Sequence, residues 1–153
     1  MTPATVFKRL AFAEAVTWTL LIIGMVLKYV THTTDLGVQV FGLVHGVVFL
    51  SYVIATVAIW IDQQWRVSTG VLGLFSSVIP YATVWFERLV ESRGLLSGAW
   101  RVTGDVEQLT GAEKVLSRAL ARPVLACVLA VLLVAALTAF LLYLGPPTSW
   151  GRA

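Results

Sequence analysis

Charged residues are scarce in this sequence. Asp, Glu, Lys and Arg make up 12% of its 153 residues, about half the ~25% that is usual in soluble domains. Hydrophobic residues make up 58% of the chain, and its mean hydropathy is +0.86. Since a soluble domain of this length could not bury so much apolar surface, the composition predicts an integral membrane protein.

Cysteine and histidine are nearly absent, which narrows the possible chemistry. Cys127 is the only cysteine, so neither an internal disulfide nor a thiolate metal site can form. Of the two histidines, His32 and His45, only His45 lies in an apolar run. Nucleotide loops, catalytic triads, paired carboxylates and zinc motifs are missing as well. We therefore expect no metal and no cofactor, and predict that the protein is not an enzyme.

The balance of charge is basic, with a formal net charge of +3. The 11 Lys and Arg residues are scattered between apolar runs and form no patch interleaved with aromatics. This distribution is typical of charges at a membrane surface. It favours the lipid bilayer as a partner and argues against nucleic acid.

Four apolar runs are long enough to cross a bilayer, which takes ~20 residues. We predict an all-α polytopic membrane protein, with a three-helix transmembrane core in residues 7–90 and a fourth, C-terminal transmembrane helix in residues 119–144. The four runs cover residues 10–30, 38–61, 68–90 and 119–144.

The segments outside the spans differ in length and composition. Residues 91–118 are predicted to form an extramembrane connection with a short helix near its end, where Thr110 and Glu113 fit a capping box. Residues 145–153 form a short tail.

Four spans would place both termini on one side of the membrane. That side would carry four Lys and Arg residues, and the other side seven. Because positive residues are enriched in the cytoplasm, the count favours a multi-pass protein of the bacterial plasma membrane with both termini outside. Lys8 and Arg9, directly before the first span, argue for the reverse orientation.

Polar residues on one face of each predicted span are the candidates for function, because they are costly in a bilayer. Small residues share these faces, as is usual where membrane helices approach each other closely. The polar candidates, functional or structural, are Glu14, Lys28, His45, Tyr52, Tyr81 and Glu87. The residues predicted to pack the helices are Gly42, Gly46, Gly73 and Pro80.

Glu14 lies about one turn inside the first span, at the level of Tyr52 and Ser76. A charge at mid-membrane costs ~2.5–3.5 kcal/mol on insertion scales, so Glu14 should be protonated, paired or within reach of water. We favour a carboxyl group near the interface that is bonded to Arg9, Tyr52 or a helix end. The alternative is a proton or cation relay with His45.

His45 lies about two turns in from the opposite side, at the level of Tyr81 and Thr83. Haem or metal ligation and proton handling are alternatives, but a ligand site usually needs several converging ligands. We favour a hydrogen bond from His45 to Tyr81 or Thr83 that fixes the helix register.

Lys28 and Glu87 lie near the ends of their spans. Lys28, followed by Tyr29, is typical of a snorkelling lysine beside an interfacial aromatic residue, and anionic lipid near Lys28 is the sharper alternative. Glu87 is expected to form either a local pair with Arg88 or a pair with Lys28 across the bundle.

Three motifs give the chain a resemblance to a known family. With these motifs in this order, residues 7–90 resemble an uncharacterised bacterial family of small integral membrane proteins, domain of unknown function 3817. The resemblance implies the fold of the first three spans and brings no established activity. Val26, Ala82 and Val84 depart from the family pattern. The motifs are Arg9 and Glu14 with Leu27-Lys28-Tyr29, then His45-Gly46-x-x-Phe49-x-x-Tyr52, then Pro80-x-x-Thr83-x-x-x-Glu87-Arg88.

A small bundle without a catalytic constellation, joined to an added loop and helix, indicates an accessory subunit. We predict that the chain docks on a larger plasma-membrane complex, such as a respiratory or lipid-transport complex. The alternatives are a small oligomeric transporter or proton-linked channel that uses Glu14 and His45, and a redox or haem-binding membrane protein.

Overall fold

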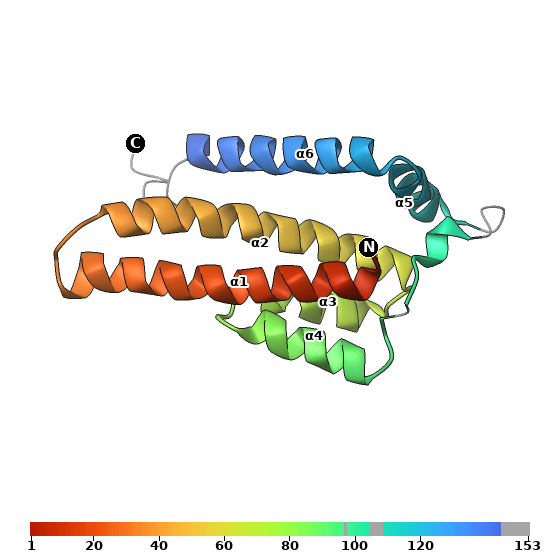
Figure 1. Cartoon of the computed structure of the whole chain (residues 1–153), viewed down its shortest axis with the longest axis horizontal. Coiled ribbons are helices and arrows are strands. Elements are labelled where there is room, and N and C mark those ends of the chain that lie inside the picture. The colour runs from red at the N-terminus through yellow and green to blue at the C-terminus, as the bar shows by residue number, and fades with distance from the viewer. Residues whose placement is uncertain (97, 105–108, 145–153) are drawn as a thin grey trace.

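The computed structural model describes residues 1–96, 98–104 and 109–144, which form helices and contain no strand (Figure 1). The predicted all-α membrane class is confirmed, because three segments are long and apolar enough to cross a bilayer. The predicted tail lies outside the described residues. The elements are α1 (Pro3–Met25), continued by the π-helical turn η1 (Val26–Val30), α2 (Leu36–Asp62), α3 (Val67–Ser76), α4 (Ala82–Ser92), the 3-10 turn η2 (Arg101–Thr103), α5 (Gly111–Ala121) and α6 (Pro123–Leu144).

The helices α1 and α2 run antiparallel side by side (Figure 1). They come closest near their connecting turn, where a Cβ atom on Gly24 would lie 2.7 Å from the backbone carbon of Gly37. Close backbone contact between glycines is how membrane helices gain packing energy. Gly42 and Gly46, both predicted to pack the helices, form a G-x-x-x-G pair on α2. Gly42 faces Leu21 across the interface, whereas a Cβ atom on Gly46 would have no neighbour within 4 Å.

The third predicted span, residues 68–90, is not one continuous helix, so this part of the prediction is wrong. α3 ends at Ser76 and α4 begins at Ala82, with Pro80 in the turn between them. Proline lacks the amide hydrogen that continues a helix and disfavours the helical conformation of the residue before it. Tyr81 then adopts a left-handed conformation, with a φ of 66°, and the chain turns back.

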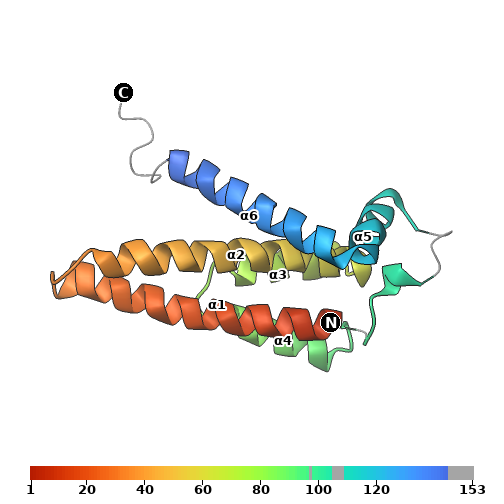
Figure 2. The same cartoon turned by 45° about the horizontal axis from the view of Figure 1, so that its top comes forward.

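Together α3 and α4 form a helical hairpin that enters and leaves at the same end of the bundle (Figures 1 and 2). The indole Nε1 of Trp65, just before α3, donates a hydrogen bond of 2.8 Å to the carbonyl oxygen of Leu95, just after α4. The length of α3 is about 15 Å, half the ~30 Å of the hydrocarbon core. The hairpin is therefore re-entrant, and the described segments that are long and apolar enough to cross the membrane are α1 with η1, α2 and α6.

The backbone at the hairpin tip is bonded within the protein, as it must be where water is absent. The hydroxyls of Ser76 and Ser77 donate to carbonyl oxygens three residues earlier, each at 2.7 Å. The amide of Ala82 likewise donates to the carbonyl oxygen three residues before it, at 3.1 Å. These bonds stabilise the break at Pro80 inside the membrane.

The hairpin changes which charges share a side of the membrane. Among the described residues, three segments and not the predicted four are long and apolar enough to cross the membrane. The end of α6 therefore lies at the opposite end of the bundle from the start of α1 (Figures 1 and 2). Of the 11 Lys and Arg residues, Arg152 lies outside the described part and Lys28 lies at the far end. The positive-inside rule now assigns the start of α1 to the cytoplasm, contrary to the earlier charge count. The other nine lie in the first turns of α1, just before α3, in the last turns of α4 or just after it, and in η2, α5 and the elbow before α6, all of which are at the end where α1 starts (Figure 1). They are Lys8, Arg9, Arg66, Arg88, Arg93, Arg101, Lys114, Arg118 and Arg122.

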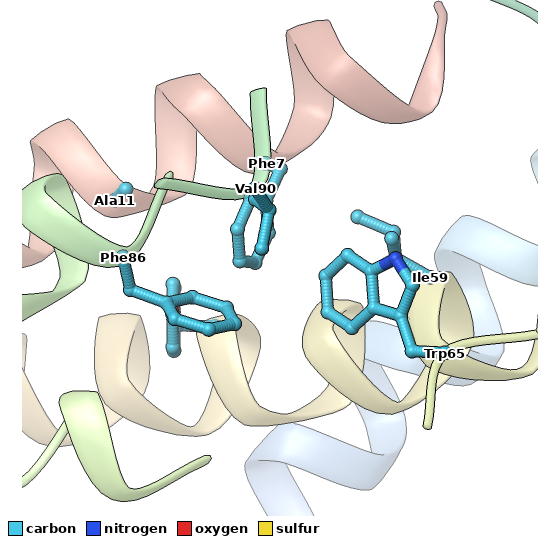
Figure 3. Close-up of a cluster of buried hydrophobic side chains, with 7 residues drawn as sticks. Phe7, Ala11, Ile59, Trp65, Phe86 and Val90 are labelled. Atoms are coloured by element: carbon cyan, nitrogen blue, oxygen red, sulfur yellow. The ribbon is translucent and has the colours of Figure 1, made fainter. Parts of the chain in front are cut away.

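Aromatic side chains form the core near the cytoplasmic end, where α1, α2 and the hairpin meet (Figure 3). Phe7 stacks on Tyr52 with 5.4 Å between ring centroids, and its edge contacts Phe86 at 6.0 Å and Trp65 at 5.9 Å. Such offset and edge-to-face contacts are favourable beyond the area they bury. Gly73 makes room for them, because a Cβ atom there would lie 2.8 Å from the Phe86 ring.

A polar latch, formed by Asp62, Arg101 and Glu113, ties the connection to the cytoplasmic end of α2. The Asp62 carboxylate accepts a hydrogen bond of 3.1 Å from the Val102 amide, and Arg101 Nε donates to the Asp62 carbonyl at 2.7 Å. Arg101 also pairs with Glu113 at the start of α5. The predicted capping box is confirmed, and hydrogen bonds from the Thr110 amide and hydroxyl lower the pKa of Glu113 to about 2. The latch therefore positions α5, and with it α6.

Gly24→Ala should destabilise the α1–α2 pair, because the added methyl group meets the Gly37 backbone, which cannot rotate away. Overpacking of this kind costs roughly 1–3 kcal/mol. Gly46→Ala is the matched control on α2, where the methyl group enters open space. Thermal melting in mild detergent should show a lower midpoint for Gly24→Ala than for the wild type, and an unchanged midpoint for Gly46→Ala. Equal midpoints for the two variants would contradict the glycine contact.

Candidate functional site

Glu14 lies on the buried face of α1 and has no exposed surface. Phe7, Ala11, Glu14 and Thr17 are buried at spacings of three and four residues, which places them on one side of the helix. That side faces α2, so the sequence period turns the carboxyl group of Glu14 toward the helix that carries His45.

His45 lies directly opposite this carboxyl group. Its Nδ1 is 3.5 Å from Glu14 Oε2 and 3.1 Å from Thr17 Oγ1. Thr17 donates its hydroxyl hydrogen to the Glu14 carbonyl at 3.0 Å, and the same hydroxyl oxygen lies within hydrogen-bond distance of His45 Nδ1. The 3.5 Å separation from Glu14 is longer than a normal hydrogen bond.

Three buried polar atoms at this site have no hydrogen-bond partner. They are both carboxyl oxygens of Glu14 and Nε1 of Trp18, one turn further along α1. The Trp18 ring packs against His45 with 4.5 Å between centroids, and Phe49 lies 6.3 Å from the same imidazole. Aromatic rings thus enclose a small polar site inside the membrane, where an unpaired charge is costly.

The arrangement of the Glu14–His45 pair allows it to hold a proton. Either the carboxyl group or the imidazole can carry it, and their separation is short enough for transfer after a small rotation of the side chains. Within the described residues, no group of three or more His, Cys, Asp and Glu side chains converges as a metal site would require.

The predicted partners of His45 are wrong. Tyr81 contacts the Thr19 hydroxyl at 3.2 Å, and Thr83 donates to the Ala11 carbonyl at 3.2 Å. Tyr81 lies at the hairpin tip and reaches Thr19, two residues from Thr17, whereas the chain has turned back by Thr83, which lies beside Ala11. The bonds predicted for Glu14 are wrong as well, since its carboxyl group has no hydrogen-bond partner.

The register between α1 and α2 explains why His45 lies beside Thr17 and Glu14. Gly24 and Gly37 touch near the turn, and Thr17 precedes Gly24 by about as many residues as His45 follows Gly37. In an antiparallel pair, residues at equal distances from such a contact meet each other. If residues are counted from the Gly24–Gly37 contact, and not from the ends of the spans, His45 falls opposite Thr17. Glu14 then lies one helical turn from Thr17 on the same face of α1.

Tyr52 forms a second polar contact, in the layer predicted for it. Its hydroxyl lies 3.0 Å from Ser76 Oγ. Since Ser76 donates its own hydrogen to the Gly73 carbonyl, Tyr52 is the donor. The bond joins α2 to the hairpin and satisfies a phenol that is fully buried.

Lys28 lies in η1 beside Asp35, whereas Glu87 lies in α4 and lines a groove with Lys8 from the start of α1, so the predicted pair between Lys28 and Glu87 does not form. Lys28 Nζ is 3.5 Å from Asp35 and 5.4 Å from the centre of the Tyr29 ring. Glu87 is buried at the cytoplasmic end, in a groove that Lys8 also lines. Pro80, predicted to pack the helices, is exposed in the turn between α3 and α4.

Comparison with known proteins places most of this architecture in one family. The profile described as Domain of unknown function (DUF3817) matches residues 4–92. A "putative membrane protein" of Streptomyces coelicolor is 42% identical over 91 residues, which are 59% of this chain and 11% of that protein. The chain thus spans about a tenth of the length of the curated relative it matches. No solved structure matches the chain. The family match ends with α4, so the latch residues Arg101 and Glu113, α5 and α6 lie beyond it.

Proposed function

Because the chain belongs to the family described as Domain of unknown function (DUF3817), we propose that it is an accessory subunit of a larger assembly in the bacterial plasma membrane and not an enzyme. The family core supplies a packed membrane unit, and the C-terminal helices supply a docking surface for a partner.

The architecture of the relative carries this proposal. In the Streptomyces coelicolor protein, the segment that matches the core is 11% of a much longer chain. In this chain the core is followed by α5 and α6. A segment that is a small part of a longer membrane protein in one organism can serve as one part of a larger membrane assembly in another.

The helix α6 supports docking because it is barely packed against the core. Val134 is the one buried residue among the α6 side chains that the structure describes. α6 diverges from α2 along its length (Figure 2), and a groove of about 420 Å³ lies between them.

Small residues line both walls of this groove. Ser51 and Ala55 belong to α2, and Ala130 and Ala135 belong to α6. Membrane helices associate through such small residues, since no hydrophobic effect drives their contact within lipid. The occupant we propose is therefore a transmembrane helix of the partner.

Purification of the full chain from its native membranes in mild detergent tests this proposal. Mass spectrometry should find a partner in stoichiometric amount. Ala135→Trp fills the groove and should lose the partner. Ala136→Trp is the matched control, because residue 136 lies about 100° further around α6 and does not line the groove.

A chain that purifies alone would contradict the accessory role. A partner that binds both tryptophan variants equally would show that the groove is not where it docks.

The second candidate is a small oligomeric transporter or proton-linked channel, which the Glu14–His45 pair favours. The specific observation is a fully buried carboxyl group without a hydrogen-bond partner, 3.5 Å from an imidazole. Such groups inside a membrane commonly belong to proton relays.

Proton flux into proteoliposomes, followed with a pH-sensitive dye, tests this candidate. Glu14→Gln should abolish the flux, because the amide cannot release a proton. Glu91→Gln, at an exposed position on α4, is the control and should leave the flux unchanged. Equal flux through all three proteins, or none through the wild type, would exclude the relay.

A further inference from the structure

The elbow between α5 and α6 forms a second groove, of about 600 Å³, on the cytoplasmic side. α5 lies across the end of the bundle, and α6 leaves it to cross the membrane (Figure 1). Pro123 begins α6, where its missing amide hydrogen costs nothing. The groove therefore opens where headgroups meet the hydrocarbon core.

The residues that line this groove change from basic to apolar with depth in the membrane. Arg118 and Arg122 are exposed at its mouth, and neither forms an ion pair with any of the described residues. Leu125, Ala126 and Leu129 of α6 form its deeper wall. Leu129 lies six residues beyond the start of α6, which is about 9 Å deeper in the membrane. A ligand that fits both parts must be anionic at one end and apolar at the other.

We propose that this elbow binds an anionic phospholipid, with its phosphate on Arg118 and Arg122 and an acyl chain along Leu125 and Leu129. Guanidinium groups bind phosphate through paired hydrogen bonds. The site lies at the end that carries nine of the positive residues, and the cytoplasmic leaflet is rich in anionic lipid.

The elbow fits an anionic lipid better than Lys28 does. Lys28 already lies 3.5 Å from the carboxylate of Asp35, and it stands at the opposite end of the bundle. Arg118 and Arg122 have no such partner within the described residues and stand above an apolar groove. The proposal does not depend on the accessory role, because it concerns lipid at the elbow and not a protein between α2 and α6.

Native mass spectrometry of the purified full chain tests the proposal. The chain is titrated with phosphatidylglycerol or with phosphatidylcholine carrying the same acyl chains. Wild type should bind phosphatidylglycerol more tightly. The double variant Arg118→Gln/Arg122→Gln should bind it about 30-fold more weakly, since each basic residue near a membrane surface is worth roughly fivefold. Its binding of phosphatidylcholine should not change.

Two further variants separate the site from its surroundings. Arg66→Gln/Arg93→Gln removes the same charge from exposed positions at the same end and should weaken binding far less. Ala126→Trp fills the groove while both arginines remain, and it should weaken binding of phosphatidylglycerol. Circular dichroism and melting confirm that each variant is folded.

Three results would overturn the proposal. The first is equal binding of the two lipids by the wild type. The second is an equal loss in the two arginine double variants, which would indicate general surface charge. The third is displacement of the lipid by soluble glycerol phosphate, which would make the elbow a phosphate site without an acyl-chain groove.

Discussion

A helix that ends inside a bilayer frees backbone groups that no water can bond, and this constraint shapes the whole chain. Pro80 imposes such an end between α3 and α4. The chain satisfies the freed groups through a tight turn and two serine hydroxyls. The turn sends α4 back to its starting side, where Trp65 bonds to Leu95. The connection, the latch and α5 consequently lie at the cytoplasmic end. From there α6 crosses the membrane with little packing against the core.

Hydropathy predicted α1, α2 and α6 because bilayer thickness alone sets the length of a spanning run. It could not predict the hairpin, since apolar residues flank Pro80 whether the chain crosses or turns back. Glu14 and His45 could be identified as buried polar residues, but their proximity depends on the register that Gly24 and Gly37 impose. A pattern such as G-x-x-x-G shows which residues are small, and only the structure shows that Gly46 faces open space.

The family core and the segment that follows it differ in how much surface they leave open for binding. The family core buries its polar groups between helices, around the aromatic cluster of Phe7, Tyr52 and Phe86. The segment beyond the family match carries the open surfaces, namely the groove beside α6 and the basic elbow. Because the latch fixes α5 to the end of α2, both surfaces are held in a defined place relative to the core. The two grooves share no lining residue, so the proposed partner helix and the proposed lipid would occupy separate surfaces.

The re-entrant hairpin underlies this entire account, and cysteine labelling in spheroplasts tests it most directly. In a Cys127→Ala background, single cysteines replace Ser68 in the first turn of α3, Ser92 at the end of α4, and Thr33 between α1 and α2, all of which are exposed. A membrane-impermeant maleimide should label only the cysteine at position 33 in intact spheroplasts, and all three after permeabilisation. Labelling at position 92 together with position 33 in intact spheroplasts would show that the third segment crosses the membrane and would contradict the hairpin.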